Sequence, residues 1–133
     1  MFYSQADQLY ACIQAILARI QQEAPAEIEA IITSNLIIRL RCSELNAQIT
    51  LNGRRRPLQA TYGRSSLRPH LDIELTGDTL HHILLGELSL KKALSSKLMK
   101  VRGPIWKAFA LAGFFQKGQA FYPQVLRELG LGL

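Results

Sequence analysis

Few side chains in this sequence are of a type and spacing that could do chemistry. His81 and His82 are adjacent, and imidazole is a common metal ligand. Neighbouring residues of a helix point about 100° apart, however, so two adjacent histidines seldom bind the same ion. The third histidine, His70, precedes a separate apolar segment. We therefore predict no metal site.

Candidate catalytic groups are equally sparse. Asp72 and Glu74 lie two residues apart, but in an alternating segment they share its polar face. Cys42 falls in the apolar register, which suits an inert thiol, and the two Ser-Ser pairs lack the glycines of a nucleophile elbow. We expect no catalytic residue and no cofactor, so the protein is predicted not to be an enzyme. The expected partners of the two carboxylates are basic residues of neighbouring strands: Arg39, Arg41, Lys100 or Arg102.

Positive charge is the other feature that could support function. The 133 residues include 16 Lys and Arg against 10 Asp and Glu, a net charge of +6, which favours contact with anionic surfaces. Arg54, Arg55 and Arg56 follow the turn signal Asn52-Gly53, so we expect an exposed cationic tip that docks on an anionic membrane surface; a solvated face is the alternative. Nucleic acid is not expected, because the outward positions of the strands hold Gln, Thr and charged residues and no platform of exposed aromatic rings.

Several segments have the periodicity of helices. Apolar residues from Leu9 to Ile20 recur at helical spacing, and Pro25 suits the first turn of a second helix over residues 26–34. Further helices are predicted from Thr79 to Leu88 and from Ile105 onward. Pro123 is expected to start a final short helix.

Between the helices the hydrophobic period changes to two. Five segments, residues 36–42, 47–52, 58–62, 71–75 and 99–102, alternate apolar with polar side chains. Parallel sheets covered on both faces contain continuous apolar runs, and these segments do not. We predict one α+β domain over residues 1–133. Its five-stranded, mainly antiparallel sheet has one wet face and one face covered by helices.

The segment from Leu71 to Gly103 resembles the sterol-carrier-protein family of lipid-binding domains. It runs LDIELTGDTLHHILLGELSLKKALSSKLMKVRG. The similarity is one of order: a strand, a helix ending near Gly86, the step Lys92-Ala93-Leu94 and a Lys-rich strand closing on glycine. Leu94 stands where an aromatic residue is common in the family. The resemblance extends over about residues 24–120, with an N-terminal helix and a C-terminal helical extension outside it.

The resemblance implies an apolar cavity, enclosed by the sheet and helices, that takes a fatty acyl chain, a sterol-like molecule or an isoprenoid. The segment Ile105–Phe115 supports it, because Lys107 is its only charge and one sheet face cannot cover so apolar a helix. Ordinary core packing with dimer contacts is the alternative. The residues predicted to line the pocket are Ile38, Leu40, Ile49, Leu51, Ile73, Leu75, Ile83, Leu84, Met99, Val101, Trp106, Phe109, Phe114 and Phe115.

The sequence thus predicts non-catalytic binding or transfer of an apolar lipid. An anionic membrane surface or a lipid-metabolising enzyme is the expected partner, and a homodimer remains open. The first five residues lack the features of a signal peptide, and the two isolated cysteines, Cys12 and Cys42, suit a reducing compartment, so we expect a cytoplasmic protein. Two alternatives stay open: a protein–protein interaction module with a filled core, and a small RNA-binding protein.

Overall fold

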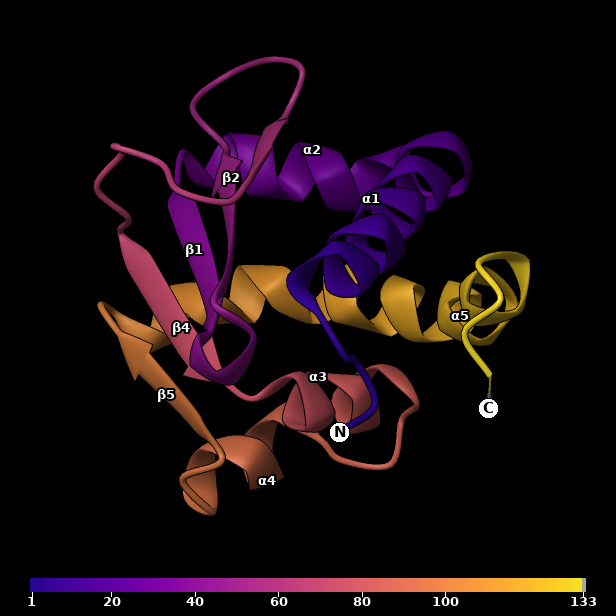
Figure 1. Ribbon diagram of the computed structural model, residues 1–133. Helices are drawn as coiled ribbons and strands as arrows, with labels where there is room; N and C mark the ends of the chain where they lie inside the picture. The colour runs from indigo at the N-terminus through magenta and orange to yellow at the C-terminus, as the bar shows by residue number, and fades with distance from the viewer. Residues whose placement is uncertain (133) are drawn as a thin grey trace.

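Two helices begin the chain in the computed structural model, which describes residues 1–132 apart from the side chains of Phe109 and Ala110 (Figure 1). Helix α1 spans Ala6–Glu23, and α2 spans Pro25–Ser34 with Pro25 at its first turn. Asn35 ends α2 in the left-handed conformation. The remaining elements are β1 (Ile37–Cys42), η1 (Ser43–Leu45), β2 (Ala47–Asn52), β3 (Gln59–Tyr62), β4 (Leu71–Leu75), α3 (Gly77–Leu84), α4 (Leu90–Ser95), β5 (Met99–Arg102), η2 (Ile105–Leu111) and α5 (Ala112–Glu128).

The five strands form one mixed sheet in the order β3-β2-β1-β4-β5. Three of the four strand pairs are antiparallel, and β1 pairs with β4 in parallel. The register places Leu40 of β1 between Ile49 of β2 and Ile73 of β4, so apolar side chains of three strands lie side by side on one face. The predicted α+β class and mainly antiparallel sheet are confirmed. The parallel pair arises because the chain crosses β2 and β1 between β3 and β4.

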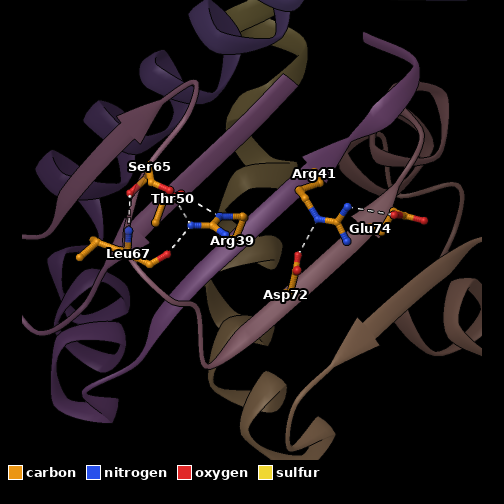
Figure 2. A network of polar contacts seen from close by, with 7 residues as sticks. All are labelled: Arg39, Arg41, Thr50, Ser65, Leu67, Asp72 and Glu74. Carbon is orange, nitrogen blue, oxygen red and sulfur yellow. Dashed lines mark hydrogen bonds and ion pairs between the residues drawn. The ribbon is translucent and has the colours of Figure 1, made fainter. Parts of the chain in front are cut away.

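This crossing segment, residues 63–70, covers part of the outer sheet face. Arg39 donates hydrogen bonds from Nη2 to the carbonyl oxygens of Ser65 and Leu67, and its Nε lies 3.4 Å from Thr50 Oγ1 (Figure 2). Thr50 is only 1% exposed. The prediction that this face is wet throughout is therefore wrong at its centre, because a loop that the strand pattern did not reveal lies across it.

The ion pairs predicted for the outer face of the sheet are present between β1 and β4. Arg41 lies between two carboxylates, with Nε 2.8 Å from Asp72 Oδ1 and Nη1 3.1 Å from Glu74 Oε2 (Figure 2). All three side chains are partly exposed to solvent. The carboxylates therefore neutralise a strand arginine, as the sequence indicated.

The inner sheet face packs against α1 and α5. Figure 1 shows α5 running behind the strands and alongside α1. The apolar side of α1 faces the sheet, and its residues Cys12, Ile16 and Ile20 are at most 1% exposed. Truncation of such a buried isoleucine to alanine costs about 2–5 kcal/mol. The helices thus form one wall of a hydrophobic core whose other wall is the sheet.

The C-terminal helices differ from the prediction in two ways. The segment from Ile105 begins as the 3₁₀ helix η2 and becomes α-helical only at Ala112. Pro123 lies inside α5 and does not start a new helix. A proline inside a helix costs about 3 kcal/mol. Burial of Tyr122, Val125 and Leu126 around it offsets that cost, because continuous packing on α1 holds both halves of the helix in line.

The region after β4 also contains one more helix than predicted. The expected helix from Thr79 to Leu88 ends at Leu84, and Gly86 follows with a φ of 77°. Residues Leu90–Ser95 then form α4, where Ser89 Oγ accepts a hydrogen bond from the backbone N–H of Lys92. In Figure 1, α4 lies next to β5, the strand at one edge of the sheet. This additional helix builds one side of the site described below.

Candidate functional site

A small apolar cavity lies between the inner sheet face and the helices. Its volume is about 50 Å³. An apolar cavity of about 150 Å³ is needed to hold a molecule the size of benzene, so this space is too small for a lipid chain. The side chains that line it come from three strands, α1, α3 and the η2–α5 segment: Ile13, Ile16, Ile38, Leu40, Ile49, Leu51, Ile73, Leu80, Leu84, Leu111, Phe114 and Phe115.

A much larger groove lies beside this cavity, under the edge strand β5 and between α4 and the η2–α5 segment. Its volume is about 660 Å³, within the range of about 300–1,000 Å³ that is typical of small-molecule sites. Lys91 and Ser95 of α4 are its polar lining residues, and both are exposed. The apolar lining residues are Ile73, Leu90, Leu94, Met99, Val101, Ile105, Ala108, Leu111, Ala112 and Phe115.

The groove and the inner cavity share three side chains, those of Ile73, Leu111 and Phe115. Ile73 and Leu111 are almost fully buried, whereas Phe115 is only partly buried. Phe115 contacts Phe114 edge to face, with ring centroids 6.0 Å apart. These three side chains form the wall between the two spaces, and Phe115 is its least buried member.

Most of the predicted pocket residues line one of these two spaces. Leu75 and Ile83 line neither and belong to the general core. Trp106 is 68% exposed and lies on the surface, not in the predicted wall, because η2 presents it to solvent. The side chain of Phe109 lies outside the described residues. Those in the inner cavity are Ile38, Leu40, Ile49, Leu51, Ile73, Leu84, Phe114 and Phe115; those in the groove are Ile73, Met99, Val101 and Phe115.

Sequence reasoning missed the α4 side of the groove. Leu90 and Leu94 are four residues apart and face the groove together, a spacing that identifies one side of a helix. The signal is short, because α4 has only six residues. Ile13 and Ile16 belong to the apolar stripe predicted between Leu9 and Ile20, but periodicity does not distinguish packed from vacant surroundings and so does not predict that they line a cavity.

The small residues of the η2–α5 segment have two different uses. Ala108 and Ala112 line the groove, as expected for residues that leave space. Gly113 does not, because a Cβ there would overlap the carboxylate of Glu27 on α2. Gly113 therefore faces the flexible end of the Glu27 side chain and not the vacant space of the groove.

The predicted arginine tip lies far from the groove in the fold. Arg54, Arg55 and Arg56 are exposed in the connection between β2 and β3, at the opposite edge of the sheet from β5 (Figure 1). Arg56 forms a two-pronged ion pair with Glu29 of α2, which lowers the pKa of that carboxyl below its usual value. One of the three arginine charges is therefore already paired.

His81 has a structural partner. Its Nδ1 lies 2.6 Å from the hydroxyl of Tyr122, which also hydrogen-bonds the hydroxyl of Tyr3, and its ring stacks on Phe2. Burial lowers the pKa of His81, and the neighbouring His82 lowers it further, so the ring is neutral near pH 7. This cluster attaches the N-terminal residues to α3 and α5. No group of three or more candidate metal ligands occurs among the residues that the structure describes.

The two cysteines are free and buried. Burial raises the pKa of the Cys12 thiol to about 11 and that of the Cys42 thiol to about 12. Because the thiolate is the reactive species, both groups are poor nucleophiles at neutral pH. The buried position of Cys42 agrees with the inward register predicted for its strand.

No protein-family model and no curated protein sequence matches the chain. Solved structures do match. The sterol carrier protein domain 2 of Helicoverpa armigera is 14% identical and aligns with a TM-score of 0.65 over 80% of this chain and 84% of its own. A ubiquinone synthesis protein with a sterol-carrier-protein domain is also 14% identical, with a TM-score of 0.59 over 86% of this chain and 91% of its own.

A third match involves a much longer protein. A stereoselective inverting sec-alkylsulfatase from Pseudomonas sp. is 21% identical over 67% of this chain, with a TM-score of 0.52, but the match spans only 14% of the sulfatase. Several other sterol carrier protein 2 structures match along most of their length. The chain therefore has the fold of sterol-carrier-protein domains, and the resemblance inferred from Leu71–Gly103 is confirmed. Among the described residues, none of the helices has the length and apolar character needed to cross a membrane.

Proposed function

We propose that the protein binds an apolar lipid in the groove beneath β5 and delivers it to a membrane or to a lipid-metabolising enzyme. The observation that supports this most directly is the groove itself, about 660 Å³ with a lining that is apolar except for Lys91 and Ser95. The inner cavity lies directly behind Ile73, Leu111 and Phe115, so a modest movement of Phe115 would lengthen the space available to a chain.

The physical driving force is burial of hydrocarbon. Each methylene removed from water contributes about 0.8 kcal/mol, so ten would contribute roughly 8 kcal/mol before the cost of immobilising the ligand. Names of matched structures include sterol carriers and a ubiquinone synthesis protein, which supports a sterol-like or isoprenoid ligand alongside a fatty acyl chain.

The proposal also concerns the activity, the partner and the location of the protein. We infer a carrier without catalytic activity of its own, which presents its lipid to a membrane or to a lipid-metabolising enzyme. Two free, buried thiols are consistent with a cytoplasmic location.

A protein–protein interaction module is the second candidate. It is favoured by the inner cavity, whose 50 Å³ means that the centre of the core is already nearly filled. On this alternative the groove would receive an apolar side of a partner protein and not a lipid.

Titration with a fluorescent fatty acid or prenyl probe distinguishes the two candidates. Ala112→Phe places a large side chain in the groove, and Ala120→Phe adds the same side chain at an exposed position of the same helix. Excluding two methylenes of the ligand costs about 1.6 kcal/mol, so Ala112→Phe should weaken probe binding about fifteenfold. Ala120→Phe should bind like the parent. Absence of probe binding to the parent protein would contradict the carrier proposal.

The stability of the apo variants provides an independent check. A side chain that fills vacant space leaves the free energy of unfolding unchanged or raises it, whereas insertion into a packed core costs about 1–3 kcal/mol. We therefore expect Ala112→Phe to melt at or above the temperature of the parent. Clear destabilisation would indicate that the groove closes in solution and would favour the interaction module.

A further inference from the structure

The excess of positive over negative charge is confined to one stretch of the chain. Residues 88–127 contain eight lysines and arginines and no aspartate or glutamate. The rest of the chain contains eight basic and ten acidic residues. The whole net charge of +6 therefore originates in the segment that forms α4, β5, η2 and most of α5, the same elements that build the groove.

This segment also presents apolar side chains to solvent. Trp106 is 68% exposed, Ile105 is 49% exposed and Leu98 is 48% exposed. Ile105 lines the groove, and Trp106 follows it directly in η2. A tryptophan that leaves most of its surface in water next to an apolar opening suggests contact with another surface.

Cations lie next to these apolar groups. The Nζ of Lys107 is 5.2 Å from the centroid of the Trp106 ring, and Lys91 lines the groove from the α4 side. Tryptophan is enriched at the level of lipid headgroups, where its ring is half in hydrocarbon and its N–H is in water. Lysines near an anionic bilayer gain electrostatic attraction. We name these four residues, Lys91, Ile105, Trp106 and Lys107, the groove mouth.

We propose that the groove mouth docks on a bilayer that contains anionic phospholipid. The lipid then passes between bilayer and groove without crossing water; that second step rests on the proposed function, whereas docking does not. Nucleic acid fits this face less well, because a single-stranded site stacks successive bases on several exposed aromatic rings, whereas this face exposes Trp106 beside a groove lined mainly by aliphatic side chains. The arginine tip is the weaker candidate for docking, because Arg56 is paired with Glu29 and the groove lies at the other edge of the sheet.

Binding of the full chain to vesicles of phosphatidylcholine with and without phosphatidylglycerol tests this assignment. Trp106 is the only tryptophan, so its emission reports on this face alone. We expect a blue shift that requires phosphatidylglycerol and weakens with salt. Sedimentation that shows binding without a shift would overturn the proposal, because another face would then make the contact.

Charge-matched variants locate the surface. Lys91→Gln with Lys107→Gln removes two charges at the groove mouth, and Arg54→Gln with Arg55→Gln removes two at the opposite edge while keeping the Arg56–Glu29 pair. Each lysine near the bilayer contributes about fivefold in affinity, so the first pair should weaken vesicle binding roughly 25-fold. The second pair should change it by less than about threefold, through long-range attraction alone. Equal losses in the two pairs would overturn the proposal.

Two further results separate docking from lipid carriage. Vesicle binding by a protein that binds no fluorescent lipid probe would leave docking intact and refute the proposed function. Probe binding by a protein that does not bind anionic vesicles would refute docking and leave the proposed function intact. Tight, salt-sensitive RNA binding that is lost in the Lys91/Lys107 variant, without vesicle binding, would also refute docking.

Discussion

Phe115 is expected to set how long a chain the protein accepts. It is the least buried of the three side chains between the groove and the inner cavity, and it lines both. Phe115→Ala should join the groove to the inner cavity. The end of a long lipid chain could then enter the 50 Å³ of that cavity and the volume that the phenyl ring occupied. Two additional buried methylenes would contribute about 1.6 kcal/mol, roughly fifteenfold in affinity.

The assay is displacement of a fluorescent acyl probe by a series of fatty acids that differ by two methylenes. The parent should reach a plateau at some chain length, and Phe115→Ala should extend that plateau by at least one member of the series. Truncation of a fully buried phenylalanine costs about 3–5 kcal/mol; Phe115 is only partly buried, so the cost should fall below that range.

Phe114→Ala is the matched control. Phe114 lines the inner cavity but not the groove, so its truncation enlarges the cavity without opening it. The chain-length profile of this variant should remain that of the parent. An unchanged profile in Phe115→Ala, or the same extension in both variants, would refute the idea that Phe115 separates the two spaces.

Three further predictions concern the scaffold. Thr50→Lys should destabilise the protein by more than about 2 kcal/mol in denaturant unfolding, because it buries a charge beneath residues 63–70, whereas exposed Gln59→Lys should cost at most about 0.5 kcal/mol. The pKa of His81 is lower in the folded than in the unfolded protein, where it is about 6.5. The stability that the neutral ring confers is therefore complete above about pH 6.5 and falls as the pH drops below that value. His81→Gln should make the melting temperature less dependent on pH in this acidic range. Gly113→Ala should change the melting temperature little, because the flexible Glu27 carboxylate can move away from the new Cβ; a loss of several degrees that Glu27→Ala reverses would contradict this.

The strand pattern predicted the inner half of the site well. Alternation assigns Ile38, Leu40, Ile49, Leu51 and Ile73 to one face, and the register brings them side by side. A period of two leaves little freedom, because a shift by one residue would turn every apolar side chain to the other face. The face to which each of these side chains points therefore follows from the local pattern, whereas their neighbourhood depends on the strand order.

The groove and the outer sheet face depend on tertiary contacts that no local sequence pattern encodes. The separate helix α4 is a six-residue element, too short for a periodic signal, and the burial of Thr50 results from a loop that crosses the sheet. Trp106 was assigned to the pocket because it lies in an apolar segment. The 3₁₀ geometry of η2 turns it to solvent instead. Pro123 similarly stays within a helix because tertiary packing outweighs its local preference.

Native mass spectrometry of the purified, undenatured chain tests the central claim most directly. A lipid carrier should retain its ligand through purification, so we expect a second mass above that of the 133-residue chain. Organic solvent should release the bound molecule, which should be a single-chain, sterol-like or isoprenoid lipid. Ala112→Phe should lose most of this species, and Ala120→Phe should retain it. Only the bare chain mass in the parent, together with an organic extract free of lipid and no uptake of added probe, would contradict the account.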